Sequence, residues 1–345
     1  MTRIKKLYVS KIISDEEMKK MKGKLIDESY MKYPVINSDI DVYYKDENGS
    51  DKLLLKFRRN VISDNEIRLG WKCYKDLAKP SRGRGASAGP IDPNNGYWKK
   101  RKLHNTTKWS TSYLLEDGTP SKMRVNNQVF STPIGYYADM KNMNSDLPCR
   151  LTHFARTNFE KYNEGIPFIQ KIDSLYKKLI PDCYDKQFNR ANLKPHLKIP
   201  ETSFSTVTIN RNFRTALHKD AGDFCEGFGN LTVITRGKYH GGYTIFPQFG
   251  VAVDVRNNDF LAMDVHQWHS NTEIYETEED KKYNESIPKA YNDNVEVGTI
   301  GIDKLYTRLT FVCYLRENLI KCPDEIDPRF LTKSGHSKIK DEESI

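Results

Sequence analysis

Four residues in the second half of the chain have the types and the order of a redox metal site. His218 and Asp220 form a His-x-Asp pair, His269 follows it, and Arg308 lies on a later predicted strand. Two histidines and one carboxylate can hold Fe(II) on one side and leave its other side open to O2 and a co-substrate. A planar guanidinium binds a carboxylate through two hydrogen bonds, which suits the far end of 2-oxoglutarate. The pattern indicates an iron-dependent oxygenase.

The second histidine ligand has two candidates, because His266 and His269 lie three residues apart. A strand is predicted to begin at Asp259, and either histidine could serve at the turn that follows it. We expect His269 to be the ligand and His266 to lie beside the site or on the surface. A zinc hydrolase is disfavoured, because the chain has no His-Glu-x-x-His motif and zinc chemistry does not explain Arg308.

Strand periodicity predicts a polar lining around this site. Alternate side chains of a strand face the same way, so a strand at 204–217 that runs on to the first histidine ligand would have one polar face. That face carries Asn210, Asn212, Arg214 and His218. On the strand predicted at 305–315, Arg308 and Thr310 share a face, and a buried arginine there requires an anionic partner.

The elements that must hold these residues are short strands separated by turns. They are predicted at 204–217, 231–235, 243–249, 251–255, 260–265 and 305–315. Many short strands at this spacing favour a sandwich or jelly roll over a parallel α/β sheet. We expect an α+β protein with its jelly-roll core at 201–320. An acidic surface insertion at 272–300 interrupts this core, and a polar tail occupies 321–345.

Residues 1–200 are predicted to form an α/β elaboration in front of that core. Asn48-Gly49 lies between two strand-like segments, which predicts a β-hairpin with a type I′ turn. The density of Gly and Pro at 79–97 predicts a long loop. Apolar residues recur at helical spacing over 166–179, which predicts an amphipathic helix that packs against a sheet.

The positive charge of the chain is concentrated in this N-terminal region. Residues 1–200 hold 38 Lys and Arg against 23 Asp and Glu, a net of +15, whereas the remainder has a net of −6. Segment 51–110 alone has a net of +10. This asymmetry favours contact with a polyanion, with a solvated lysine-rich surface as the alternative. Arg82, Arg84 and residues 97–102 combine cations with aromatic rings, which suits phosphate contact and base stacking.

Composition and cysteine spacing set the expected compartment. The 37% of hydrophobic residues suffice for a folded core, and no run of them is long enough to cross a membrane. The start of the chain lacks the apolar segment of a secretion signal, so we expect an intracellular protein of the nucleus or cytoplasm. The six cysteines are scattered without a Cys-x-x-Cys motif. They are expected to be reduced thiols.

Several segments resemble the oxygenase domain of the TET/JBP family, in particular the thymine hydroxylase domain of the base J-binding proteins. Three of them surround the predicted ligands, at 208–223, 241–249 and 259–273. The segments 55–60 and 150–154 and the loop that ends at Pro90 are similar to the region that precedes that domain. The resemblance implies a double-stranded β-helix (a jelly roll of two sheets), Fe(II), 2-oxoglutarate, O2 and hydroxylation of a base methyl group.

Carried over by position, the resemblance implies roles for individual residues. His218, Asp220 and His269 match the metal ligands of the family. Arg308 matches the arginine that binds 2-oxoglutarate, with Thr310 assisting it. Because the acidic insertion lengthens the chain between His269 and Arg308, Arg316 remains a second candidate for this arginine. The substrate contacts expected beside them are Asn210, Asn212, Arg214, Arg82 and Arg84.

The implied reaction converts thymine in DNA to 5-hydroxymethyluracil, with the base flipped out of the duplex. Alternatives are the same chemistry on 5-methylcytosine, RNA or a protein side chain, and a DNA-binding module without catalysis. The complete metal motif argues against the last. The residues after the oxygenase segment are too few for a separate DNA-binding domain. Selectivity for a site in DNA is therefore expected to come from the oxygenase or from a protein partner of unknown kind.

Overall fold

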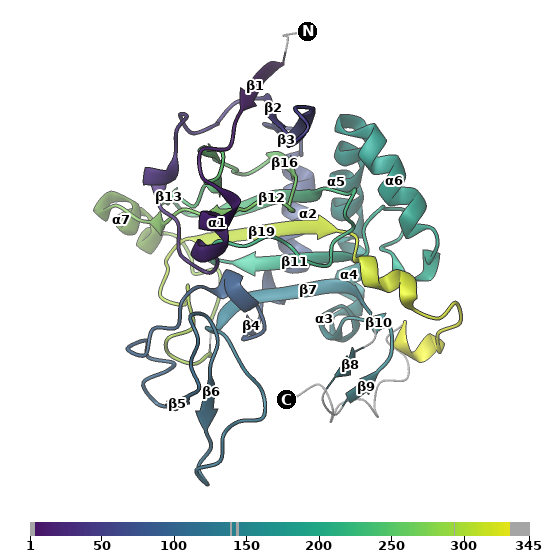
Figure 1. The fold of residues 1–345 in the computed structure, drawn as a ribbon. Helices are drawn as coiled ribbons and strands as arrows, with labels where there is room; N and C mark the ends of the chain where they lie inside the picture. Colours follow the sequence, from purple (N-terminus) through teal and green to yellow (C-terminus); the bar gives the residue numbers. More distant parts are fainter. Residues whose placement is uncertain (1–3, 139, 143–144, 293, 332–345) are drawn as a thin grey trace.

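The computed structural model describes residues 4–138, 140–142, 145–292 and 294–331, and a large β-sheet forms its centre (Figure 1). The strands of this sheet are β1 Lys5–Val9, β2 Ile40–Lys45, β3 Asp51–Arg58, β4 Pro80–Ser81, β7 Val129–Tyr137, β10 Arg150–Leu151, β11 Thr206–Arg211, β12 Gly229–Arg236, β16 Phe260–Met263 and β19 Thr307–Tyr314. Their order is β1-β2-β3-β16-β12-β19-β11-β7-β10, and β4 pairs with β7. Strands from both halves of the chain therefore share one sheet.

A smaller sheet lies against one face of the large one. It has the order β15-β14-β17, with β14 at Thr244–Phe246, β15 at Val251–Val253 and β17 at Ser270–Asn271. Phe246 and Val251 of this sheet share a hydrophobic core with Leu55 and Leu261 of the large sheet. Two-stranded pairs complete the β structure: β5 Lys102–His104 with β6 Ser112–Leu114, β8 Met140–Asn142 with β9 Ser145–Leu147, and β13 His240–Gly241 with β18 Ile274–Tyr275.

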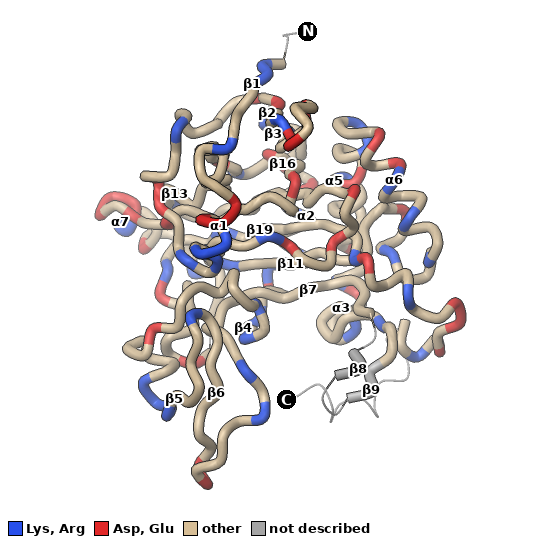
Figure 2. The backbone as a smooth tube through the Cα atoms, in the orientation of Figure 1, with Lys and Arg blue, Asp and Glu red and all other residues tan. Residues whose placement is uncertain are grey.

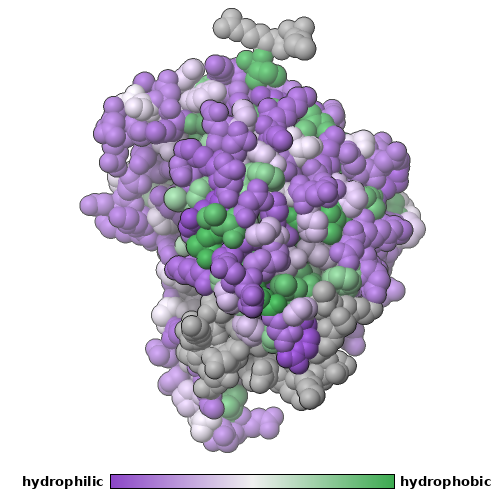
Figure 3. Space-filling view, turned by 90° about the vertical axis from the view of Figure 1, so that its right-hand side faces the viewer, coloured by the Kyte–Doolittle hydropathy of each residue, from purple (hydrophilic) through white to green (hydrophobic). Residues whose placement is uncertain are grey.

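Helices α2 to α6 cover the opposite face of the large sheet, whereas α1 packs against the smaller sheet (Figure 1). The α-helices are α1 Asp15–Met21, α2 Asp64–Tyr74, α3 His153–Thr157, α4 Phe159–Glu164, α5 Ile166–Leu179, α6 Pro181–Ala191 and α7 Glu278–Ser286. The 3-10 helices are η1 Glu28–Tyr30, η2 Lys75–Leu77, η3 Gly85–Ala88, η4 Pro195–Leu197, η5 Glu317–Lys321 and η6 Pro328–Phe330. The helix predicted at 166–179 is confirmed as α5, whose buried Ile169 and Ile172 belong to the main core. The face of the molecule shown in Figure 3 is mainly hydrophilic.

The mixed α+β class and the six predicted strands are confirmed, although five of these strands are shorter than expected and β12 is longer. The predicted alternation along β19 is also confirmed. Leu309 and Phe311 pack into the core under the helices, whereas Thr310 and Val312 face the other side. One face of the central strands thus builds the core and leaves the other face free for polar chemistry.

The hairpin predicted around Asn48-Gly49 is confirmed, but its turn type is not. Only Gly49 of this pair has a positive φ, at 78°, whereas a type I′ turn requires two such residues. The connection is longer, because Asp46 N–H donates to Ser50 O at 2.9 Å. The Asp46 carboxylate accepts the N–H groups of Asn48 and Ser50 at 3.0 and 2.8 Å, which stabilises the longer loop.

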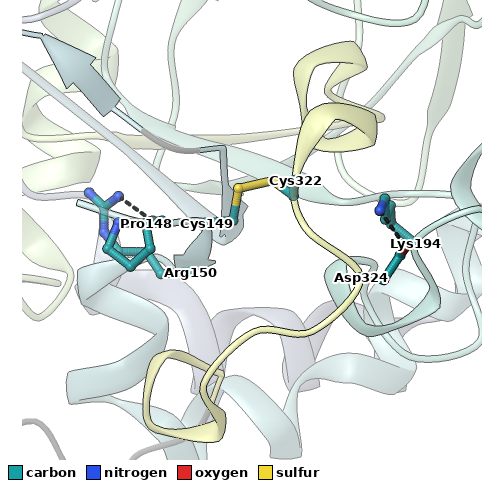
Figure 4. Close-up of a disulfide and its surroundings, with 6 residues drawn as sticks. All are labelled: Pro148, Cys149, Arg150, Lys194, Cys322 and Asp324. Atoms are coloured by element: carbon teal, nitrogen blue, oxygen red, sulfur yellow. Dashed lines mark hydrogen bonds and ion pairs between the residues drawn. A yellow bond between two sulfur atoms is a disulfide. The ribbon is translucent and has the colours of Figure 1, made fainter. Parts of the chain in front are cut away.

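The prediction that all six cysteines are free thiols is wrong for two of them. Cys149 and Cys322 form a buried disulfide with a Cα–Cα distance of 6.0 Å (Figure 4). It joins the chain before β10 to the segment after η5, next to an ion pair of Lys194 with Asp324. Their separation of 173 residues hides this contact from any reading of local spacing. Four cysteines remain free: Cys73, Cys183, Cys225 and Cys313.

Reduction of this disulfide is expected to destabilise the fold. A cross-link that closes so long a loop contributes up to about 5 kcal/mol by restricting the unfolded chain. The Cys149→Ser/Cys322→Ser variant should melt about 5 °C or more below the unaltered protein and no longer respond to dithiothreitol. Thermal unfolding with and without reductant measures this. Cys225→Ser, which removes an exposed free thiol, is the matched control, and equal melting of all three proteins would contradict the prediction.

Within the described ranges, no helix has the length and apolar character of a membrane span. The predicted polar tail is described as far as Leu331, where η6 has just ended, and residues 332–345 lie outside the described residues. Within the predicted acidic insertion, the chain forms β18 and α7. Thr277 caps α7 by accepting from Asp280 N–H, and the Asp280 carboxylate accepts from Thr277 in return.

Candidate metal centre

Two segments that are far apart in the sequence hold His218 and His269 side by side. Each histidine donates its backbone N–H to the carbonyl of the other, at 3.0 Å in both directions. Asp220 N–H donates to Val265 O at 3.0 Å, so the His-x-Asp turn is tied to the second segment at two points. This pairing fixes the three side chains on a common backbone frame.

The three side chains direct their ligand atoms to one point. His218 Nε2 lies 3.4 Å from Asp220 Oδ1, and His269 Nε2 lies 3.8 Å from Asp220 Oδ2. One ligand atom from each residue falls within 4.8 Å of the other two. Two imidazole nitrogens and a carboxylate oxygen at such separations fit the donor set of a divalent transition metal.

Backbone carbonyls orient both imidazole rings for ligation. His218 Nδ1 lies 2.7 Å from Ala216 O, and His269 Nδ1 lies 2.9 Å from Gln267 O. A hydrogen bond from Nδ1–H to a carbonyl leaves Nε2 without a proton, as a metal ligand must be. The geometry of these residues therefore fits a bound metal ion.

Electrostatics favour the ligating protonation states. Burial raises the pKa of Asp220, but its interactions with the neighbouring imidazoles of His218 and His269 outweigh burial and hold the pKa at about 2. Burial, helped by the nearby His218, lowers the pKa of His269 to about 4. At neutral pH the carboxylate is ionised and the His269 ring is neutral.

His266, the other histidine considered for this site, lies outside the group. Its Nε2 is 3.3 Å from Phe224 O, and its backbone N–H donates to the Asp264 carboxylate at 3.0 Å. The structure thus brings together His218, Asp220 and His269, the three residues that the sequence pattern favoured.

A cavity of about 490 Å³ opens over this group. Its lining includes the inward face of β11 and β19, part of the predicted Gly-rich loop and the turn that follows His218. The side chains and backbone that line it are Lys22, Gly83, Arg84, Gly85, Ala86, Ser87, Thr208, Asn210, Phe213, Thr215, His218, Lys219, Asp220, Ala221, Gly222, Asp223, Leu231, Thr244, Met263, His269, Ser270, Asn271, Thr310, Val312, Tyr314 and Arg316. The cavity is large enough for a small dicarboxylate together with a base-sized group.

A chain of hydrogen bonds crosses the cavity wall from the loop to β19. Arg84 Nε donates to Ser131 Oγ at 2.6 Å, and Ser131 Oγ donates to Asn210 Oδ1. Asn210 Nδ2 then donates to Thr310 Oγ1 at 3.1 Å. Arg84 Nη2 is buried without a hydrogen-bond partner among the described residues. Sequence reasoning singled out three of these residues, but nothing in the pattern pointed to Ser131 of β7.

Arg308 is buried and is not among the residues that line the cavity. It is 2% exposed, and its Nη2 donates to Gly242 O at 3.1 Å. Thr310, two residues along the same face, and Thr244, two residues beyond that glycine, both line the cavity. In the part of the chain that the structure describes, no carboxylate makes an ion pair with Arg308, so its buried charge requires an anion from elsewhere.

Three residues expected to contact a substrate lie outside the cavity lining. The strand-phase argument fails after Arg211, because β11 ends there and Asn212 adopts a φ of 48°. Asn212 Nδ2 donates to Tyr306 O at 3.0 Å, and Arg214 Nη2 donates to Ile26 O at 2.7 Å. Arg82 Nη1 donates to the Tyr97 hydroxyl at 2.9 Å.

Besides Asp220 and Arg84, the cavity is lined by a second carboxylate, Asp223, and a second arginine, Arg316. Asp223 follows Asp220 by three residues in the same turn, a spacing that could have drawn attention to it. Burial and the charge of Asp220 raise the pKa of Asp223 well above its ordinary value, against the influence of Arg316. Arg316, the alternative arginine, donates from Nη2 to the Tyr314 hydroxyl at 3.1 Å, and its guanidinium lies 5.1 Å from the Tyr137 ring centroid.

Comparison with known families identifies a related domain. The Tet_JBP family model, described as the oxygenase domain of the 2OGFeDO superfamily, matches residues 133–317, more than half of the chain. The matched range contains all three residues of the metal group and both candidate arginines, Arg308 and Arg316.

Individual relatives match over part of their length. The bifunctional helicase and thymine dioxygenase JBP2 of Trypanosoma cruzi (strain CL Brener) is 32% identical over 197 residues, which are 57% of this chain and 16% of that protein. Thymine dioxygenase JBP1 of Trypanosoma brucei brucei is 34% identical over 151 residues, 44% of this chain and 18% of that one. The match thus spans less than a fifth of these curated relatives. Among solved structures, NgTET1 in complex with 5mC DNA aligns over 90% of this chain and 94% of its own, at 11% identity and a TM-score of 0.47.

Proposed function

We propose that this chain, which belongs to the Tet_JBP family of 2-oxoglutarate/Fe(II) oxygenase domains, hydroxylates the methyl group of thymine in DNA. Membership of the family makes it an enzyme that uses Fe(II) and 2-oxoglutarate. The thymine substrate is supported by relatives that are themselves thymine dioxygenases. The observation that carries the proposal is the His-Asp-His group at the base of a cavity.

His218, Asp220 and His269 would hold the iron. Their support is the orientation of both rings by backbone carbonyls and the convergence of the three ligand atoms within 4.8 Å. Bound there, Fe(II) with 2-oxoglutarate and O2 supplies the oxidising power to convert a C–H bond into C–OH, with succinate and carbon dioxide as by-products. The large sheet and the β15-β14-β17 sheet would be the two layers of the double-stranded β-helix that surrounds this site.

Arg308 would bind the remote carboxylate of 2-oxoglutarate, assisted by the Thr310 hydroxyl. Its burial, its lack of an ion-pair partner among the described residues and its place two residues before Thr310, which lines the cavity, support this role. Its bond to Gly242 O and its contact with Tyr239 leave further N–H donors of the guanidinium for a ligand. A bidentate carboxylate contact would neutralise the buried charge.

The substrate base would enter the cavity from the opposite side. A methyl group inside a duplex cannot approach a buried metal, so thymine must leave the base stack. Arg84 and Asn210 line the cavity and are joined through Ser131, which would hold both side chains in place against the incoming nucleotide. The product of the reaction would be 5-hydroxymethyluracil in DNA.

Product analysis tests this proposal directly. The purified protein is incubated with Fe(II), ascorbate, 2-oxoglutarate and duplex DNA that contains thymine and 5-methylcytosine, and the nucleosides are identified by mass spectrometry. We expect 5-hydroxymethyluracil to form only when 2-oxoglutarate is present. Hydroxymethylcytosine alone would replace thymine by methylcytosine as the substrate. Succinate without any modified nucleoside, followed by product on RNA or on a peptide, would contradict the DNA substrate.

A further inference from the structure

Three segments that are distant in the sequence meet at the mouth of the cavity. The turn after α1 pairs with the residue before the first histidine ligand: Gly23 N–H donates to Leu217 O, and Leu217 N–H donates to Lys24 O, both at 2.8 Å. The loop between β5 and β6 reaches the same place, because Lys108 Nζ donates to Lys20 O at 3.2 Å. The mouth is therefore built from the turn after α1, this loop and the His-x-Asp turn.

Close packing fixes these segments relative to one another. Gly23 has a φ of +76°, and a Cβ atom on it would lie 2.6 Å from Cε3 of Trp109 in the β5–β6 loop. The glycine thus lets the indole ring approach the backbone of the turn. Lys22 Nζ lies 5.8 Å from the centroid of the same ring, and Lys219 Nζ lies 5.3 Å from that of Trp268. The cations are held over aromatic surfaces and not on free loops.

The exposed cations of these segments form one cluster, which we term the lysine rim. It consists of Lys19, Lys20, Lys22, Lys24, Lys108 and Lys219. Lys22 and Lys219 also line the cavity. Burial and the charge of the nearby Lys24 lower the pKa of Lys108, so these two lysines are close enough to influence each other. Figure 2 shows Lys and Arg gathered beside α1.

Throughout the described ranges, none of the six rim lysines makes an ion pair with a carboxylate. The nearby Asp15 bonds to Lys11 at 2.6 Å and acts on Lys219 only through longer-range attraction. The basic segment 51–110, which contributes Lys108 to the rim, is partly neutralised within the fold. Seven of its fifteen cations are paired with acids, namely Lys52, Lys56, Arg58, Arg59, Lys72, Lys75 and Arg101. Within the described part of the chain, the rim thus offers a polyanion six lysines outside any ion pair, two of which line the cavity.

We propose that the lysine rim binds the sugar-phosphate backbone of duplex DNA and holds it over the cavity while a base is turned inward. This inference rests on the proposed function for its substrate, and it adds the surface that binds the duplex. Six like charges around an opening focus a positive potential on it, which a row of phosphates neutralises with release of counterions. No base contact is required of the rim, so it supplies affinity rather than sequence selectivity.

The salt dependence of DNA binding tests this proposal. The variant Lys22→Gln/Lys108→Gln/Lys219→Gln removes three charges from the rim, and Lys177→Gln/Lys178→Gln/Lys282→Gln removes three exposed charges from α5 and α7. Fluorescence anisotropy measures the affinity of each protein for a duplex of about 30 base pairs, at NaCl concentrations from about 50 to about 300 mM. The rim variant should lose about two to three units of the log–log salt slope and bind more than about tenfold more weakly at 100 mM, whereas the control keeps both values.

Each outcome has a defined meaning. An unchanged slope in the rim variant, or an equal loss in both variants, overturns the lysine rim. Failure of the proposed function differs from this, because the unaltered protein would then form no 5-hydroxymethyluracil although it binds DNA. A rise in melting temperature with Mn(II) and 2-oxoglutarate in both variants confirms that their metal sites are folded. A rim that binds RNA hairpins but not duplex DNA would also overturn the proposal.

Discussion

Asp220→Ala is expected to abolish turnover of 2-oxoglutarate, by more than about 1,000-fold, because it removes the only carboxylate of the metal group. Even partners behind a metal ligand typically contribute 10- to 100-fold, and a ligand contributes more. The fold should persist, since the Asp220 side chain packs into no hydrophobic core and its backbone N–H still reaches Val265 O. Succinate formation measures the loss.

Metal binding separates this effect from unfolding. Mn(II), which stands in for Fe(II) without oxidation, should raise the melting temperature of the unaltered protein and not that of Asp220→Ala. His266→Ala is the matched control, because His266 lies three residues from a ligand but outside the metal group. It should keep both metal binding and turnover. Activity retained by Asp220→Ala, or lost equally in His266→Ala, would show that the ligand set is wrong.

Local patterns predicted the parts of this site that depend on local physics. The period of two along β19 placed Thr310 and Val312 opposite Leu309 and Phe311, and helical spacing predicted α5 within its observed bounds. These patterns work because one face of each element must bury apolar area against a neighbour. The motif of a His-x-Asp pair with a later histidine also predicted the metal group correctly, because the two segments that carry these residues pair directly with each other.

The same reasoning failed where one residue changes the backbone direction. A left-handed residue inside a presumed strand ends its alternation, and Asn212 with a φ of 48° does so directly after β11. Asn212 Oδ1 instead accepts from Arg308 N–H at 2.8 Å, so this side chain supports β19 and does not line the cavity. Asparagine is disfavoured in strands and tolerates a positive φ, so its residue type was the one local signal for this break.

Long-range contacts were the other source of error. Neither the disulfide of Cys149 with Cys322 nor the hydrogen bond of Ser131 with Asn210 has a signature in nearby residues. The count of basic residues over 51–110 predicted the charge of this segment but not its use, because acids elsewhere in the fold pair with six of its fifteen cations. Net charge along a sequence locates cations, and only the fold shows which of them are free.

Arg308→Gln is expected to raise the 2-oxoglutarate concentration for half-maximal turnover about 100-fold. Truncating one partner of a buried, hydrogen-bonded charge pair costs about 2–5 kcal/mol, and 2.7 kcal/mol corresponds to a factor of about 100. Arg308→Lys should recover only part of this loss, because an ammonium keeps the charge without the planar fork. The affinity of the protein for duplex DNA should not change, since Arg308 is 2% exposed and lies away from the cavity mouth.

Arg316→Gln is the matched control for this prediction, because it removes the same charge just beyond the opposite end of β19. Arg316 already contacts the Tyr314 hydroxyl and the Tyr137 ring, and its backbone pairs with that of Asp223, so its guanidinium has protein partners without a ligand. Arg308 has no acid at ion-pair distance among the described residues, and its need for an external anion is greater. We therefore expect Arg316→Gln to change the 2-oxoglutarate requirement less than about fivefold, under 1 kcal/mol. The reverse ranking of the two variants would place the co-substrate carboxylate at Arg316.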